Sequence, residues 1–91
     1  MFSIRVKIIN PLGLHARAAA SLVRLAGTFQ SEIKIRRAEN KAVFADAKSI
    51  LSVLALAASK STELEIEING ADQKEAVKAI EEIFIKGFGE V

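Results

Sequence analysis

The sequence predicts an α+β fold in which three helices cover one face of a four-stranded antiparallel sheet. Segments 2–8, 32–37 and 63–68 alternate apolar and polar residues, which is typical of half-buried strands. Segments 16–26 and 72–86 carry apolar residues at helical spacing. With a short strand and a short helix between them, the order is β-α-β-β-α-β-α. When helices lie on one side of an antiparallel sheet, the apolar face of the sheet and the apolar faces of the helices are buried against each other. This order of elements therefore favours that architecture.

The first strand runs from Phe2 to Ile8, and its polar residues give it a basic solvent face. The turn residues that follow it are Asn10, Pro11 and Gly13. Helical spacing then begins at Ala16 and continues to about Ala26. Its apolar stripe consists of Ala19, Leu22, Val23 and Ala26. Gly27 favours the end of this helix.

The middle of the chain predicts a hairpin and a short helix. A strand over Glu32–Arg37 is followed by a turn at 38–41 and a short returning strand, Ala42 to Ala45. Asp46 or Ser49 can then cap a helix that reaches Leu56. That helix has more apolar residues than one face can bury, so we expect part of it to be exposed.

The last third predicts one strand and one helix. The strand Glu63 to Ile68 alternates glutamate with apolar residues, and a turn follows it. Asp72 and Glu75 resemble a capping box at the start of the next helix, which Gly87 ends. We expect the remaining four residues, 88–91, to fray.

The solvent-facing charges predict the order of the strands. The fourth strand is purely acidic on this face, the first is basic, and the second is mostly basic. Opposite charges on facing cross-strand positions stabilise a sheet by a few tenths of a kcal/mol, up to about 1 kcal/mol each. The fourth strand therefore fits best between the first and the second, which gives the order 1-4-2-3.

Composition limits the function of the chain. Its 91 residues indicate a single domain over 1–91, and its net charge of +2 is too mild to favour a nucleic-acid partner. There is no cysteine and only one histidine, so we expect no disulfide, no metal site and no cofactor. We find no signal peptide, and the longest apolar run, Ile50 to Ala58, is broken by Ser52. We therefore expect a cytoplasmic protein without a membrane partner.

The single histidine, His15, lies at the junction between the first strand and the first helix. The first backbone N–H groups of a helix have no partner within it, and together with the helix dipole they favour anions. An imidazole at this junction can carry a phosphoryl group or lie beside one. Composition alone leaves an ordinary surface histidine as the alternative.

Two motifs resemble those of a known family. Residues 13–17 read Gly-Leu-His-Ala-Arg, and residues 48–51 read Lys-Ser-Ile-Leu before the fourth strand. At these places they resemble HPr, the histidine-containing phosphocarrier of the bacterial phosphoenolpyruvate-dependent phosphotransferase system. The resemblance covers essentially the whole chain and implies the HPr-like open-faced β-sandwich.

The resemblance also implies a mechanism. Enzyme I would phosphorylate Nδ1 of His15, and the chain would pass the phosphoryl group to a sugar-specific or regulatory EIIA-type protein. Arg17 would neighbour the phosphoryl group, together with the backbone N–H groups of Ala16, Arg17 and Ala18. The protein would be a carrier with a transient phosphohistidine rather than a free-standing enzyme, and we expect a monomer.

The second motif implies a regulatory site. Ser49 matches a serine that an ATP-dependent HPr kinase/phosphorylase modifies in some bacteria, although a serine there is most often only an N-cap. The apolar patch that matches the docking surface for partners is Ile50, Leu51 and Leu54, with burial in the core as the alternative.

The chain departs from the commoner family pattern at Ala18, where most members have proline. Alanine restores a backbone N–H in the first helical turn, so we expect either an added donor near the phosphoryl group or a water-bound amide. The ending over 86–90, Lys-Gly-Phe-Gly-Glu, resembles the nitrogen-regulatory branch of the family. It leaves open whether the chain serves sugar uptake or regulation alone.

Two other classes of function remain to be tested. One is a regulatory module that binds a transcription factor or an enzyme and transfers nothing, which the presence of His15 argues against. The other is a small-ligand or nucleic-acid-binding domain of similar size. Absence of salt-dependent retention on a polyanion would set the nucleic-acid reading aside.

Overall fold

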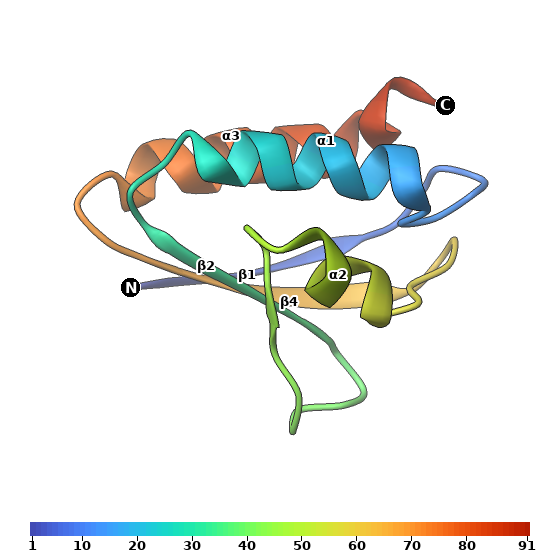
Figure 1. The fold of residues 1–91 in the computed structure, drawn as a ribbon, viewed down its shortest axis with the longest axis horizontal. Coiled ribbons are helices and arrows are strands. Elements are labelled where there is room, and N and C mark those ends of the chain that lie inside the picture. The colour runs from blue at the N-terminus through green and yellow to red at the C-terminus, as the bar shows by residue number, and fades with distance from the viewer.

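A computed structural model describes residues 1–91, and its elements follow the predicted order (Figure 1). The strands are β1 (Phe2–Lys7), β2 (Glu32–Arg37), β3 (Ala45–Asp46) and β4 (Glu63–Asn69). The helices are α1 (Ala16–Gly27), α2 (Ile50–Ala55), α3 (Gln73–Ile85) and a final 3-10 turn, η1 (Gly87–Gly89). None of these helices has the length and apolar character that a membrane span requires.

The strands form one antiparallel sheet in the order β1-β4-β2-β3, which confirms the predicted order. The register places Glu65 of β4 opposite both Arg5 of β1 and Arg36 of β2. Both guanidinium groups donate hydrogen bonds to this carboxylate, and they lower its pKa, Arg5 most strongly. The acidic strand therefore lies between two basic strands, as cross-strand charge pairing favours.

A single core lies between the sheet and the helices. The apolar residues of β2 and β4 that face the helices are fully buried, whereas those of the edge strand β1 are only partly covered. α1 and α3 lie side by side over this face (Figure 1), and α2 packs beside α1 and near β3. The predicted stripe of α1 is correct, since Ala19, Leu22 and Ala26 are buried and Val23 partly so.

The hairpin after β2 was predicted incorrectly. Only Ala45 and Asp46 pair with β2, so the strand expected over Ala42–Ala45 begins three residues later and is shorter. Residues 38–44 project away from the sheet as a loop (Figure 1). The Phe44 ring lies against the charged face of β2, with the Arg36 guanidinium 4.6 Å from its centroid. This cation–π contact takes the place of ladder pairing at Phe44.

The end of one helix and the cap of another differ from the prediction. Gly27 lies inside α1, and Thr28 follows as the C-cap, where its hydroxyl donates to the Leu25 carbonyl over 2.7 Å. Asp72 occupies the N-cap of α3, but its side chain makes no capping bond. It accepts instead from the backbone N–H groups of Gln30 and Ser31 before β2. A tertiary contact thus replaces the expected capping box.

The C-terminal tail is ordered, whereas the sequence prediction was that it would fray. Gly87, Phe88 and Gly89 have φ angles of 56°, 57° and 75°, which turn the chain back toward the start of α1. The Phe88 ring packs edge-on against Phe84 with centroids 5.1 Å apart. Val91 lies over Gly87, where a Cβ atom would collide with it. These contacts fix the residue between them, Glu90.

Candidate functional site

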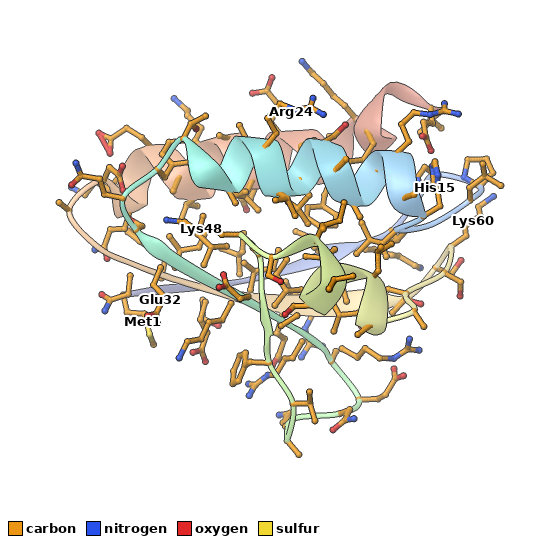
Figure 2. All side chains as sticks on the ribbon, in the orientation of Figure 1. Met1, His15, Arg24, Glu32, Lys48 and Lys60 are labelled. Carbon is orange, nitrogen blue, oxygen red and sulfur yellow. The ribbon has the colours of Figure 1, made fainter.

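His15 is the N-cap residue of α1, and its extended backbone (φ −72°, ψ 178°) joins the preceding turn to the helix. In Figure 2 it lies at one end of the molecule, where α1 begins. The turn is fixed because the Gly13 N–H donates to Asn10 O and the Leu14 N–H donates to Ala58 O, at 3.1 and 2.9 Å. Gly13 has a φ of 65°, and a Cβ atom there would lie 2.5 Å from Ala58 O, so the close approach requires glycine.

The first turn of α1 presents unpaired donors next to this histidine. The Ala19 N–H is the first to bond within the helix, to the His15 carbonyl over 2.8 Å. The N–H groups of Ala16, Arg17 and Ala18 precede it and have no acceptor in the protein. The His15 side chain makes no capping bond to them. These three N–H groups are therefore available to bind an anion, as the sequence predicted.

Glu90, the residue in closest polar contact with His15, is not among the site residues predicted from sequence. Its two carboxylate oxygens lie 2.7 and 3.0 Å from His15 Nε2. The contact is partly covered, with 23% of the His15 side chain and 14% of the Glu90 side chain exposed. Two glycines around an aromatic in the tail were the available signal, because such a pattern favours turns with positive φ.

Asn10 holds this carboxylate in place. The Asn10 side chain is fully buried, and its Nδ2 donates to Gly13 O at 2.8 Å and to Glu90 Oε1 at 3.0 Å. The turn before α1 and the tail after α3 are thus joined by one amide group. Its own oxygen, Oδ1, has no hydrogen-bond partner.

Arg17 lies at the edge of the site. Its side chain is 78% exposed, and its Nη1 is 3.8 Å from Glu90 Oε2. With Glu90, it lines a shallow hollow completed by Pro11, Leu12 and Gly89. An exposed guanidinium at this distance is free to move toward a second anion.

The second predicted site lies at the start of α2. Ser49 is its N-cap, and the Ser49 hydroxyl accepts a hydrogen bond from the Ser52 N–H over 3.4 Å. Of the two residues predicted as possible caps, Asp46 and Ser49, it is therefore Ser49 that caps the helix. Ile50 is 38% exposed and Leu51 77% exposed, whereas Leu54 packs partly against the core. The predicted apolar patch is therefore centred on Ile50 and Leu51.

Glu90 is expected to make the stability of the protein depend on pH. Its pKa is lowered, first by the Asn10 hydrogen bond and then by His15, while burial opposes the shift. A carboxyl whose pKa is lower in the folded state stabilises fully above its unfolded pKa, and this stabilisation is lost as pH falls through the folded pKa. We expect the native protein to lose stability below about pH 4.5, and the Glu90→Gln variant to lose less.

Urea unfolding midpoints across a series of pH values measure this effect. The informative quantity is the midpoint of the native protein minus that of Glu90→Gln, which should shrink as the solution is acidified. A difference that stays constant or grows toward low pH would contradict the assignment.

The fold and the site together define a class: open-faced α+β sandwiches that present one accessible imidazole at a helix N-terminus. Comparison with known proteins agrees. The sequence model of the family described as "PTS HPr component phosphorylation site" matches residues 2–86. The chain belongs to the HPr family, whose general role is that of a phosphocarrier in the phosphotransferase system. Enzyme I and EIIA-type proteins are the general partners of that family.

Individual relatives span nearly the whole chain. Phosphocarrier protein HPr of Cupriavidus necator is 45% identical over 83 residues, covering 91% of this chain and 90% of that protein. Phosphocarrier protein NPr of Proteus mirabilis is 43% identical, covering 94% and 93%. Among solved structures, HPr-C-His from Thermoanaerobacter tengcongensis matches with a TM-score of 0.91 at 33% identity, covering 100% of this chain and 99% of that one.

Proposed function

We propose that this protein accepts a phosphoryl group from phospho-Enzyme I on Nδ1 of His15 and passes it to an EIIA-type protein. The observation that carries the proposal is the position of His15, an imidazole at the N-cap of α1 beside three N–H groups without acceptors. A neutral imidazole is a competent nucleophile.

The surroundings of His15 suit an anionic product. The N–H groups of Ala16, Arg17 and Ala18 and the dipole of α1 stabilise negative charge at this end of the helix. Arg17 offers a forked, charge-assisted contact from the surface. Ala18 has a backbone N–H, which a proline at this position would lack, and this N–H has no acceptor in the protein. It is therefore available either to contact the phosphoryl group or to bind a water molecule.

The phosphoryl-transfer assay tests this function directly. The chain is incubated with Enzyme I and radiolabelled phosphoenolpyruvate, and we expect an acid-labile label, as a phosphohistidine gives. A folded chain that stays unlabelled by an Enzyme I active on a control HPr would contradict the proposal. It would favour the alternative, a regulatory module that binds a transcription factor or an enzyme without transferring a group.

The exposed apolar residues of α2 support a docking surface for these partners. Leu51 leaves 77% of its surface uncovered on the helix that packs beside α1. We expect Leu51→Asp to weaken the binding of Enzyme I about tenfold, because an apolar contact is lost and a charge must be desolvated. The fold should persist, since an acidic residue in the first turn suits the helix dipole.

Isothermal titration with Enzyme I measures this loss. The matched control is Val43→Asp, which places the same charge on a residue that is 59% exposed in the loop after β2. Equal weakening by both variants would show that net charge, and not the α2 surface, is responsible.

We also propose Ser49 as a site of regulatory phosphorylation by an HPr kinase/phosphorylase. Its hydroxyl caps α2, and a helix N-terminus tolerates the negative charge of a phosphate. The phosphate would stand next to Ile50 and Leu51 and would oppose docking by acidic partners.

A further inference from the structure

The outer edge of β1 is six residues long and has no partner strand in the protein. Ile8, just after β1, bonds on the side of β4, where its N–H donates to Thr62 O over 3.0 Å. Such bonds alternate along an antiparallel strand, so Ser3, Arg5 and Lys7 direct their N–H and C=O groups away from β4. A row of unpaired backbone groups of this kind can bind a further strand.

An apolar groove runs beside this edge, between β1 and the last turns of α3. It has a volume of about 370 Å³, and its apolar lining consists of Val6, Ile9, Phe84 and Ile85. Ile85 is 72% exposed and Ile9 is 37% exposed. Val6 is only partly buried, whereas the apolar residues of β2 and β4 on the same face of the sheet are fully buried. Uncovered apolar surface therefore lies next to the unpaired backbone.

The charges along this edge select the kind of strand that can pair with it. Arg5 and Lys7 line the groove from the solvent face of the sheet. Lys7 is opposite Glu63 in the register, but that carboxylate lies 3.6 Å from Arg5 Nη1, and Lys7 has no ion pair of its own. On the helix side the groove is lined by Glu81. An added strand fits best with acidic residues on the solvent face and apolar residues toward α3, where a further acid would meet Glu81.

We propose that the outer edge of β1 binds an extended segment of a partner protein in which acidic and apolar residues alternate. The segment joins the four-stranded sheet as an additional strand. β4, which pairs with β1 on its other side, already has this pattern, with Glu63, Glu65 and Glu67 between apolar residues. Backbone hydrogen bonds supply affinity in such complexes, and alternate side chains supply specificity.

This edge is separate from the proposed docking surface on α2. The sheet order places β1 at one edge and β3 at the other, and α2 packs near β3. The inference therefore goes beyond the proposed phosphoryl transfer and does not depend on it.

A second copy of this chain fits the edge less well. Antiparallel pairing of two β1 strands about Arg5 would place the two guanidinium groups opposite each other, and it would place Lys7 opposite Ser3. Like charges that are directly opposite destabilise a strand pair. Charged side chains on an edge strand are also a common protection against self-pairing. The charges therefore favour an acidic strand and oppose association of the chain with itself.

The test uses the full chain and a capped peptide with the sequence of residues 62–69, which has the β4 pattern. A second peptide has lysine in place of each glutamate. Isothermal titration measures the affinity, and amide hydrogen exchange followed by NMR shows which backbone N–H groups become protected. The chain variants are Ile85→Glu, which places an acid in the groove, and Val43→Glu, the same change at a residue that is 59% exposed in the loop after β2.

The exchange measurement tests strand addition itself. We expect the acidic peptide at saturation to slow exchange at the N–H groups of Ser3, Arg5 and Lys7 by about tenfold or more, because these groups become hydrogen-bonded. The N–H groups of Ile4 and Val6, which face β4, should keep their native rates. Binding without protection of the outward N–H groups, faster exchange along β4, or no binding at millimolar peptide would overturn the proposal.

The affinities test the groove and its charge. Ile85→Glu should bind the acidic peptide about tenfold more weakly than the native chain, because a carboxylate replaces an apolar contact and repels the glutamates. Val43→Glu should bind like the native chain, and the lysine peptide should bind the native chain about tenfold more weakly or less. Equal weakening by both variants, or equal binding of both peptides, would contradict the proposal.

Light scattering after size-exclusion chromatography tests the competing occupant. We expect the chain without peptide to be a monomer. A dimer whose outward β1 N–H groups are protected in the absence of peptide would assign this edge to a second copy and overturn the proposal.

Discussion

Replacing His15 with alanine should abolish the acid-labile label that Enzyme I places on the native protein. The loss should be about 1000-fold or more, because the variant lacks the nucleophile itself and not merely a group that assists it. His15 is the only histidine and the chain has no cysteine, so the variant has no other imidazole and no thiol to serve as the nucleophile. Labelling with radioactive phosphoenolpyruvate, followed by acid treatment, measures the effect.

The fold should survive this substitution. The His15 side chain makes no capping bond to α1, so alanine removes no helix cap. Arg24→Ala, an exposed change on the same helix, serves as the control and should label normally. An acid-labile label that persists in His15→Ala would contradict His15 as the acceptor, and an acid-stable one would point to a hydroxyl such as that of Ser49.

Replacing Phe84 with alanine should destabilise the protein by about 3–5 kcal/mol, a large share of the roughly 5–15 kcal/mol that a small domain possesses. The ring is 1% exposed in the core beneath α3, so its removal leaves a cavity as well as losing apolar burial. It also supports Phe88, and the loss should loosen the tail that carries Glu90.

Urea unfolding monitored by far-UV circular dichroism measures this change. The control is Ile85→Ala, one residue along the same helix, whose side chain is 72% exposed and should change the stability by less than about 0.5 kcal/mol. Similar losses in both variants would contradict the dominant contribution of the buried Phe84 ring, because alanine favours a helix at both positions.

The successful predictions from sequence share a local cause. Alternation in β1, β2 and β4 and helical spacing in α1 and α3 depend only on which face of an element is buried. The strand order could be predicted as well, because the sign of the charge on each solvent face selects its neighbours. His15 was found for the same reason, since the junction of a strand and a helix is visible in the residues that flank it.

The errors share a different cause, which is competition from contacts made outside the element itself. Asp72 looked like a helix cap, but the N–H groups before β2 were better placed to use its carboxylate. Phe44 looked like a strand residue, but its ring is held against Arg36. In both places a tertiary contact outweighed a local preference of a few tenths to about 1 kcal/mol.

The fold class, the sheet order, the imidazole at the start of α1 and the resemblance to the HPr family could all be inferred from the order and chemistry of the residues. The contact between His15 and Glu90 could be seen only in the folded chain. Glu90 is separated from His15 by 75 residues and from Asn10 by 80, so no local pattern relates them. They meet because α3 returns over the sheet beside α1 and three positive φ angles turn the tail inward. Contacts of that kind exist only once the core has formed, and a pattern of neighbouring residues does not encode them.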